Sequence, residues 1–285
     1  MSNALKSRLE RLACPGTLAD GTPCRIISLA HVRQLADEAG VSGRTIEITS
    51  LERGVIPERY LRNFTSLSAD DQIQLLKSSV CIVGLGGLGG LVTDTLARLG
   101  IGRLSLVDGD VFEGHNLNRQ LLSSYDGIGA SKAQAAAKRV TTINPGLEVN
   151  AIAAYLAPAN AADIINTSHL VVDCLDNIRS RFTLASAARQ AVIPMVSAAV
   201  AGLAGHITTI FPEDRGLEEI YGPPDRLPAD KGEELRLGCL APGVNLMASL
   251  ECAEVLKVLL GKDNTLQNKL LMVDLTDYTF DVLQL

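Results

Sequence analysis

Short apolar runs alternate with amphipathic segments along most of the chain, a pattern typical of α/β proteins. The run at 80–83 is apolar and partly β-branched, as expected for a buried strand. A helical pattern at 91–99 follows, and Gly100 is its expected end. A second apolar run at 104–107 ends on Asp108. Together these segments predict a strand, a helix and a second strand in one βαβ unit.

The same alternation continues to the end of the chain. Further strands are expected near 150–152, at 170–174, 195–200 and 206–211, and twice within 269–285. Further helices are expected at 132–140 and 161–166, from 183 onward, and at 241–262. The pattern therefore predicts an α/β fold with a mainly parallel sheet, extended by antiparallel C-terminal strands.

Residues 1–56 stand apart from this pattern, so we predict a small helical N-terminal extension at 1–56 and a main domain at 57–285. The segment at 14–24 is rich in turn residues, and 29–53 has the pattern of a helix-turn-helix unit. The second of these helices carries acidic as well as basic residues, which does not favour DNA binding. A docking or dimer-stabilising role is the expectation.

Composition narrows the class of protein. The 285 residues are 47% hydrophobic with a net charge of −6, which permits a large core and does not favour a nucleic-acid binder. The stretch at 191–211 carries no Asp, Glu, Lys or Arg, but Pro194 and two glycines make it two buried strands rather than a membrane span. The six cysteines are scattered without a disulfide pattern, so a reducing cytoplasm is expected.

A glycine cluster at the first strand's end indicates nucleotide chemistry. Gly84, Gly86 and Gly89 match G-x-G-x-x-G, with Gly87 between them, and Asp108 follows about twenty residues later. The glycines allow a tight turn close to a phosphate, which also suits the N-terminus of the following helix. A carboxylate at the end of the second strand can accept the hydroxyls of a ribose. This Rossmann-like pattern alone leaves NAD, FAD and ATP open.

The polar loop after the second strand favours a triphosphate. Asp110, Asn116, Arg119 and Gln120 lie in it, and Lys132 begins the next helix. A triphosphate carries more charge than a dinucleotide pyrophosphate and needs cations and donors to hold it. Arg119 can bridge phosphate oxygens with its planar guanidinium group, Asn116 can donate amide hydrogens, and Lys132 is a further cation.

Five segments together resemble the HesA/MoeB/ThiF family of ubiquitin-activating-enzyme-like adenylyltransferases. They are ERYLRNF at 58–64, GLGGLGG at 84–90, LVDGDVFEGHNLNRQ at 106–120, IGASKAQAA at 128–136 and VVDCLDNIRSRF at 171–182. The resemblance covers 57–285, with Asn63 in place of the family's Gln in the first segment. It implies ATP- and magnesium-dependent adenylation of the C-terminal glycine carboxylate of a ubiquitin-like sulfur-carrier protein.

The resemblance also implies roles for individual residues. Asp176 corresponds to the magnesium-binding aspartate, and Arg119 and Lys132 to cations that stabilise the departing pyrophosphate. Arg62 corresponds to an arginine that reaches the triphosphate bound by the partner subunit, which implies a homodimer. Arg181 matches the arginine that the family carries in the same helix, and we expect it to be structural or to orient the carrier's tail.

Two family features are missing from the chain. The polar segment at 211–237, expected to be a mobile crossover loop, lacks the cysteine that some members use for sulfur transfer. The paired C-x-x-C motifs are also absent, so no zinc is expected, and Cys239 is interpreted as structural.

Three alternatives remain open. The same adenylation chemistry could act on a tRNA-bound threonylcarbamoyl group or on a peptide. The glycine pattern also fits an NAD-binding oxidoreductase, although the cationic loop opposes it and no His, Lys or Tyr set of that class is evident. The helical extension could instead read DNA, with the nucleotide fold as a sensor.

Overall fold

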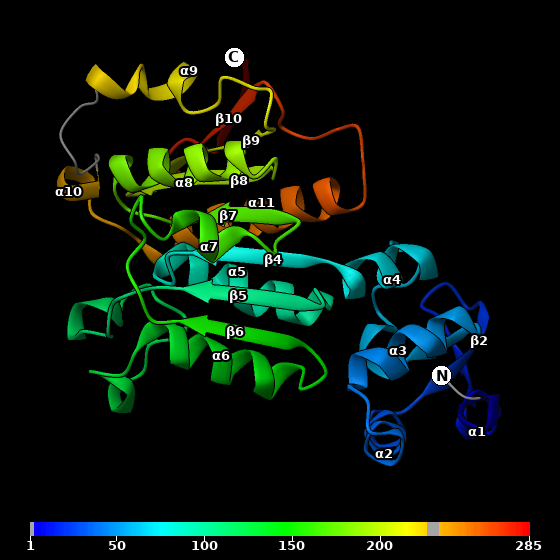
Figure 1. Cartoon of the computed structure of the whole chain (residues 1–285). Helices are drawn as coiled ribbons and strands as arrows, with labels where there is room; N and C mark the ends of the chain where they lie inside the picture. Colours follow the sequence, from blue (N-terminus) through cyan, green and yellow to red (C-terminus); the bar gives the residue numbers. More distant parts are fainter. Residues whose placement is uncertain (1–2, 227–233) are drawn as a thin grey trace.

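A computed structural model describes residues 3–226 and 234–285 (Figure 1). Its main domain is built on one eight-stranded sheet with the order β11-β10-β9-β8-β7-β4-β5-β6. The strands are β4 (Ser79–Val83), β5 (Arg103–Val107), β6 (Glu148–Ile152), β7 (Leu170–Asp173), β8 (Met195–Ala201), β9 (Ala204–Ile210), β10 (Lys269–Asp274) and β11 (Thr279–Gln284). The helices are α4 (Ala69–Lys77), α5 (Gly87–Leu99), α6 (Lys132–Ile143), α7 (Ala161–Ile165), α8 (Ile178–Gln190), α9 (Glu218–Tyr221), α10 (Glu234–Leu237) and α11 (Ala241–Leu259).

Both faces of the sheet are covered, which is why its central strands are apolar throughout. Residues of α5, α6 and α11 form one core with one face of β4 and β5. Residues of α7 and α8 form a second core with the other face of β4 and with β7. The helix α5 ends at Gly100, whose φ of 84° is the left-handed conformation expected at a helix C-terminus.

The direction of the strands matches the expectation from sequence. Strands β6, β5, β4, β7 and β8 pair in parallel, and β9, β10 and β11 continue the sheet in antiparallel pairs. The chain order reverses at β4, which has β5 on one side and β7 on the other. In open parallel sheets, ligands bind at the carboxyl ends of the strands beside such a reversal.

The crossover segment after β9 is only partly described. It contains α9, α10 and a 3-10 turn, η4 (Pro224–Arg226), where the sequence analysis expected a loop. The central part of that expected loop, 227–233, lies outside the described residues.

The N-terminal extension contains a sheet as well as helices. Helices α1 (Asn3–Leu12), α2 (Leu29–Ala39) and α3 (Gly43–Glu52) pack with strands β1 (Cys14–Thr17), β2 (Pro23–Ile27) and β3 (Val55–Pro57). The segment expected as a turn at 14–24 is an antiparallel hairpin of β1 and β2, and β3 adds in parallel. This sheet is not evident from the sequence, because strands of three to five residues give almost no periodicity.

The extension lies against the amino ends of the central strands, at the lower right of Figure 1. Arg44 on α3 donates from Nη1 to the Gly102 carbonyl oxygen, which precedes β5, at 2.9 Å. Glu47, also on α3, is buried and pairs with Arg59 of η1 (Glu58–Tyr60) at 2.8 Å. The helix that would read DNA in a helix-turn-helix unit therefore uses these two polar side chains to dock on the main domain.

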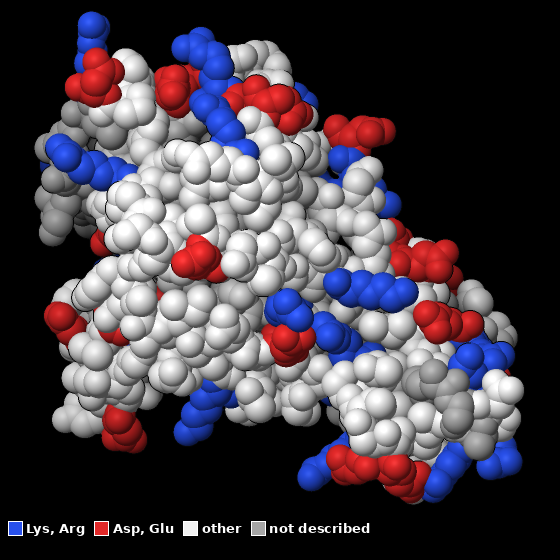
Figure 2. Space-filling model, viewed as in Figure 1, with Lys and Arg blue, Asp and Glu red and all other residues white. Residues whose placement is uncertain are grey.

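Charges on the surface of the extension are mixed in sign on the face that Figure 2 shows. Its ion pairs include Arg8–Glu38 and Arg53–Glu10. A DNA-binding face would instead gather basic side chains in one patch. Within the described residues, no helix combines the length and the apolarity needed to cross a membrane.

Candidate functional site

A cavity of about 1270 Å³ runs along the sheet edge where the parallel strands end. It begins at the glycine turn after β4 and the carboxyl end of β5, and it continues past β7 and β8 to β9, β10 and β11. Most residues expected from the sequence line it: Gly84, Gly86, Gly87, Asp108, Asp110, Arg119, Gln120, Lys132 and Asp176. Gly89, Asn116 and Arg62 are not among its lining residues.

Two glycines of the turn are required by close backbone approach. Gly84 has a φ of +91°, and a Cβ added there would lie 2.5 Å from the Cys174 carbonyl oxygen. A Cβ on Gly89 would lie 1.8 Å from the Gly84 carbonyl oxygen. Gly86 is the N-cap of α5 and supplies no side-chain cap, so the N–H groups of the first helical turn lack that partner. A helix N-terminus with uncapped N–H groups can bind a phosphate.

Asp108 is held rigidly beside the turn. Its Oδ2 accepts from the Leu85 N–H at 2.7 Å, and its Oδ1 accepts from the Asp110 N–H at 2.8 Å. Each carboxylate oxygen keeps a further lone pair. The carboxylate can therefore accept hydroxyl groups, as a ribose-binding residue must.

Lys132, Asp110 and Tyr155 form a chain of contacts on the cavity wall. Lys132 Nζ lies 2.9 Å from Asp110 Oδ2, and the Tyr155 hydroxyl donates to Asp110 Oδ1 at 2.7 Å. Partial burial favours the neutral carboxyl group, but the hydrogen bonds from Tyr155 and Lys132 outweigh it and hold the pKa of Asp110 below its usual value. Asp110 is therefore ionised and neutralises the ammonium group that the sequence analysis expected on a phosphate.

Of the remaining predicted site residues in the loop after β5, some line the cavity and one does not. Arg119 lines the cavity, and its Nη1 donates to the His115 carbonyl oxygen at 3.1 Å and to Asn118 Oδ1 at 2.9 Å. Gln120 is buried, and its Oε1 has no hydrogen-bond partner among the described residues. Asn116 is buried away from the cavity, where its Oδ1 accepts from the Glu113 N–H at 3.0 Å.

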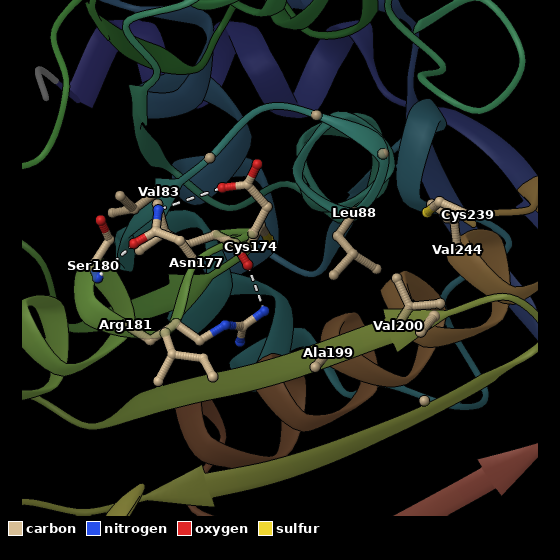
Figure 3. Close-up of a pocket in the computed structure, with 18 of the residues that line it drawn as sticks. Val83, Leu88, Cys174, Asn177, Ser180, Arg181, Ala199, Val200, Cys239 and Val244 are labelled. Carbon is tan, nitrogen blue, oxygen red and sulfur yellow. Dashed lines mark hydrogen bonds between the residues drawn. The ribbon is translucent and has the colours of Figure 1, made fainter. Parts of the chain in front are cut away.

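The aspartates near β7 have different surroundings. Asp173 is fully buried and accepts from Ser197 Oγ at 2.7 Å and from Arg181 Nη1 at 2.9 Å. Asp176 is exposed on the cavity wall, where Asn177 Nδ2 is 3.4 Å from its Oδ1. Figure 3 shows Arg181 extending from α8 toward Cys174, and its Nη2 donates to the Leu175 carbonyl oxygen. Asp176 is therefore the aspartate that a ligand can reach.

The residues at this edge fit magnesium in a nucleotide complex. Within the described residues there is no group of three or more His, Cys, Asp or Glu side chains that could hold a metal alone. Magnesium at a nucleotide commonly uses one or two carboxylates, with phosphate oxygens and water as its other ligands. Asp176 supplies one accessible carboxylate beside the glycine turn.

The other half of the cavity is a passage walled by small residues of β8 and β9, among them Ala199, Ala201 and Gly205. On β9, His206 Nε2 is 3.0 Å from the hydroxyl of Tyr221 on α9. Burial, reinforced by the charge of Arg181, lowers the pKa of His206 to about 4, so the imidazole is neutral near pH 7. His206 is therefore a neutral polar group on this passage, whereas Asp274 and Asp281 are acidic residues of the same cavity.

Neither Tyr155 nor His206 was given a site role from the sequence. Both residues line the cavity: Tyr155 follows the end of β6, and His206 lies near the start of β9. The one local signal for Tyr155 is its place just after an expected strand end, where ligand-binding residues of parallel sheets gather.

The chain and its fold are similar to several known proteins. The model of the ThiF family matches residues 59–285. The chain is 32% identical over 226 residues to the "SAMP-activating enzyme E1" of Haloferax volcanii, covering 79% of this chain and 83% of that one. It is 35% identical over 206 residues to the "Molybdopterin-synthase adenylyltransferase" of Escherichia coli (strain K12), covering 72% and 82%. The fold is similar to the crystal structure of PaaA, with a TM-score of 0.64, 20% identity and coverage of 96% and 98%.

Proposed function

The chain is an adenylyltransferase that belongs to the ThiF family, and we propose that it adenylates the C-terminal glycine carboxylate of a ubiquitin-like sulfur carrier. One observation carries the proposal: a single cavity joins the glycine turn to a passage of small residues on β8 and β9. The first part suits ATP. The second suits a thin, extended peptide end.

The phosphates and the ribose of ATP each have suitable groups in the first half of the cavity. The phosphates lie on the glycine turn and the N-terminus of α5, where N–H groups and the helix dipole favour an anion. Asp108 accepts the ribose hydroxyls. Arg119 and Lys132 supply positive charge toward the triphosphate, and Lys132 reaches it by exchanging its contact with Asp110.

The reaction needs placement more than acid–base chemistry. The carrier's glycine carboxylate is already ionised near pH 7, and its oxygen attacks the α-phosphorus of ATP. A phosphorus–oxygen bond forms there as the bond from the α-phosphorus to the bridging oxygen breaks, so pyrophosphate leaves and an acyl adenylate remains. Arg119 and Lys132 stabilise the charge that develops on the pyrophosphate. Asp176 would hold magnesium, which would supply further positive charge near the departing pyrophosphate.

The passage on β8 and β9 accepts the carrier's tail in this proposal. Ala199 and Ala201 present only small side chains to the cavity, and a glycine tail without side chains can approach them closely. The remaining wall, which includes Met272 and Asp281 of β10 and β11, lies farther along the same edge. The carboxylate therefore enters from the antiparallel end of the sheet and meets ATP at the parallel end.

Arg62 takes part only through a second copy of the chain. It is exposed in the turn between η1 and α4 and does not line the cavity of its own subunit. In a homodimer it would reach the triphosphate of the partner subunit, adding one more cation to the departing pyrophosphate.

The test is pyrophosphate exchange into ATP with magnesium and a panel of ubiquitin-like carriers that end in Gly-Gly. Exchange should appear with at least one carrier and disappear when the last glycine of that carrier is removed. Asp176→Ala should abolish exchange while leaving the melting temperature unchanged, because its side chain is exposed. Asp163→Ala, an exposed aspartate outside the cavity, is the matched control.

Two results would contradict the proposal. If only a peptide or a tRNA-bound carboxylate supports exchange, adenylation stands but the substrate is not a sulfur carrier. Tighter binding of NADH than of magnesium-ATP would favour an oxidoreductase instead.

A further inference from the structure

The Tyr155 side chain is 69% exposed. Even so, hydrogen bonds hold both its hydroxyl group and its backbone oxygen. It follows β6 and lines the cavity beside Asp108 and Asp110. Its hydroxyl donates to Asp110 Oδ1 at 2.7 Å. Its backbone oxygen accepts from Asn160 Nδ2 at 2.9 Å. An exposed aromatic ring held in this way is ready to contact a ligand without losing much freedom.

The ring occupies the space that a side chain at Gly109 would need. A Cβ built on Gly109 would lie 2.6 Å from Tyr155 Cγ and 2.7 Å from each Cδ atom. Gly109 does not have the positive φ that requires glycine elsewhere in the chain. Its role is therefore to provide space, which lets the Tyr155 ring lie against the backbone next to Asp108.

We propose that Tyr155 is a specificity-determining residue whose exposed ring face stacks on the base of the bound nucleotide, and that Gly109 makes room for it. This inference rests on the nucleotide binding of the proposed function. Asp108, which accepts the ribose, directly precedes Gly109, so a base attached to that ribose lies within reach of the ring. Aromatic rings stack on any base through their π-faces, and such contacts commonly account for about tenfold or more in affinity.

Calorimetric titration with magnesium-ATP tests the proposal without any carrier. Tyr155→Ala should weaken ATP binding about tenfold or more, whereas Tyr155→Phe should stay within about threefold because it keeps the ring. Tripolyphosphate, which has no base, should bind Tyr155→Ala as it binds the wild type. Because the ring is mostly exposed, melting temperatures of these variants should remain near that of the wild type.

Gly109→Ala is a second test. The added methyl group would displace the Tyr155 ring, so this substitution should weaken ATP binding when Tyr155 is present. It should have little further effect when combined with Tyr155→Ala. The proposal is overturned if Tyr155→Ala binds ATP within twofold of the wild type. It is also overturned if Tyr155→Ala loses tripolyphosphate and ATP equally, or if Gly109→Ala is equally harmful in both backgrounds. A wild-type chain that does not bind ATP would overturn the proposed function as well, whereas ATP binding without carrier-driven exchange would leave this inference standing.

Discussion

The Cys174 thiol, just after β7, lies 3.8 Å and 3.9 Å from the two carboxyl oxygens of Glu251 on α11. Glu251 is fully buried beneath the glycine turn. Burial, and secondly the charge of Asp173, raises its pKa well above the usual value, and Arg181 opposes this only in part. A thiol is a weak donor and cannot compensate a buried anion. Burial therefore favours the neutral form of the Glu251 carboxyl group in the folded chain.

We expect Glu251→Gln to increase stability at neutral and alkaline pH. In the wild type the unfolded chain releases the proton above its ordinary pKa of about 4.3 while the folded chain keeps it, so stability falls as pH rises through that window. The amide has no proton to release. Urea unfolding at a series of pH values above about 4.3 should show a gap between variant and wild type that widens with pH until the folded chain also releases the proton.

Glu254→Gln, one turn along the same helix, should have the opposite effect. Glu254 Oε2 accepts from Thr209 Oγ1 and from the Leu266 N–H, both at 2.7 Å, and Lys257 Nζ contacts its other oxygen at 2.7 Å. Replacing one oxygen by NH2 leaves a buried contact unsatisfied, at a cost of about 1–3 kcal/mol. If both glutamine variants are destabilised equally at every pH, Glu251 is not neutral in the folded chain.

Gly100→Ala and Gly40→Ala should differ in cost although both glycines end helices with positive φ. A Cβ on Gly100 would lie 2.6 Å from the Tyr60 hydroxyl oxygen, whereas nothing lies within 4 Å of one on Gly40. Both variants lose about 1 kcal/mol from the backbone conformation. Gly100→Ala should lose about 1–3 kcal/mol more because Tyr60 is buried. If the two variants lower the melting temperature equally, the contact with Tyr60 adds no cost to Gly100→Ala.

His206 should make the chain sensitive to acid. Its folded pKa of about 4 lies below the ordinary value of about 6.5, so the unfolded chain binds the proton first and stability is lost as pH falls through this window. The loss approaches ~3 kcal/mol near pH 4. His206→Gln keeps a polar group for Tyr221 and does not titrate. Its stability between about pH 7 and pH 4 should fall less than that of the wild type, and parallel curves would count against the assignment.

Lys132→Ala should lower the rate of pyrophosphate exchange by about a hundredfold or more, because a donor aimed at developing charge is lost. Lys138→Ala removes an exposed lysine from the same helix and should leave the rate unchanged. Since Lys132 also pairs with Asp110, melting curves of both variants separate a loss of fold from a loss of catalysis. Similar rates for the two variants would remove Lys132 from the site.

The sequence by itself determined the βαβ unit and most of the nucleotide half of the cavity. Local rules suffice there: the apolar run of β4 requires burial, Gly84 must adopt a positive φ, and Asp108 directly follows the next strand. The direction of most strands was likewise predictable, because helical patterns separate the first strands, and short turns join β8 to β9 and β10 to β11.

Only the tertiary structure decided how distant side chains meet. It brings Tyr155 to Asp110 across 45 positions of sequence, and it buries Asn116, whose Oδ1 accepts from the Glu113 N–H. It also places His206 against Tyr221 on the cavity wall. No periodicity reports such contacts, since they depend on where strand ends and loops converge once the core has packed.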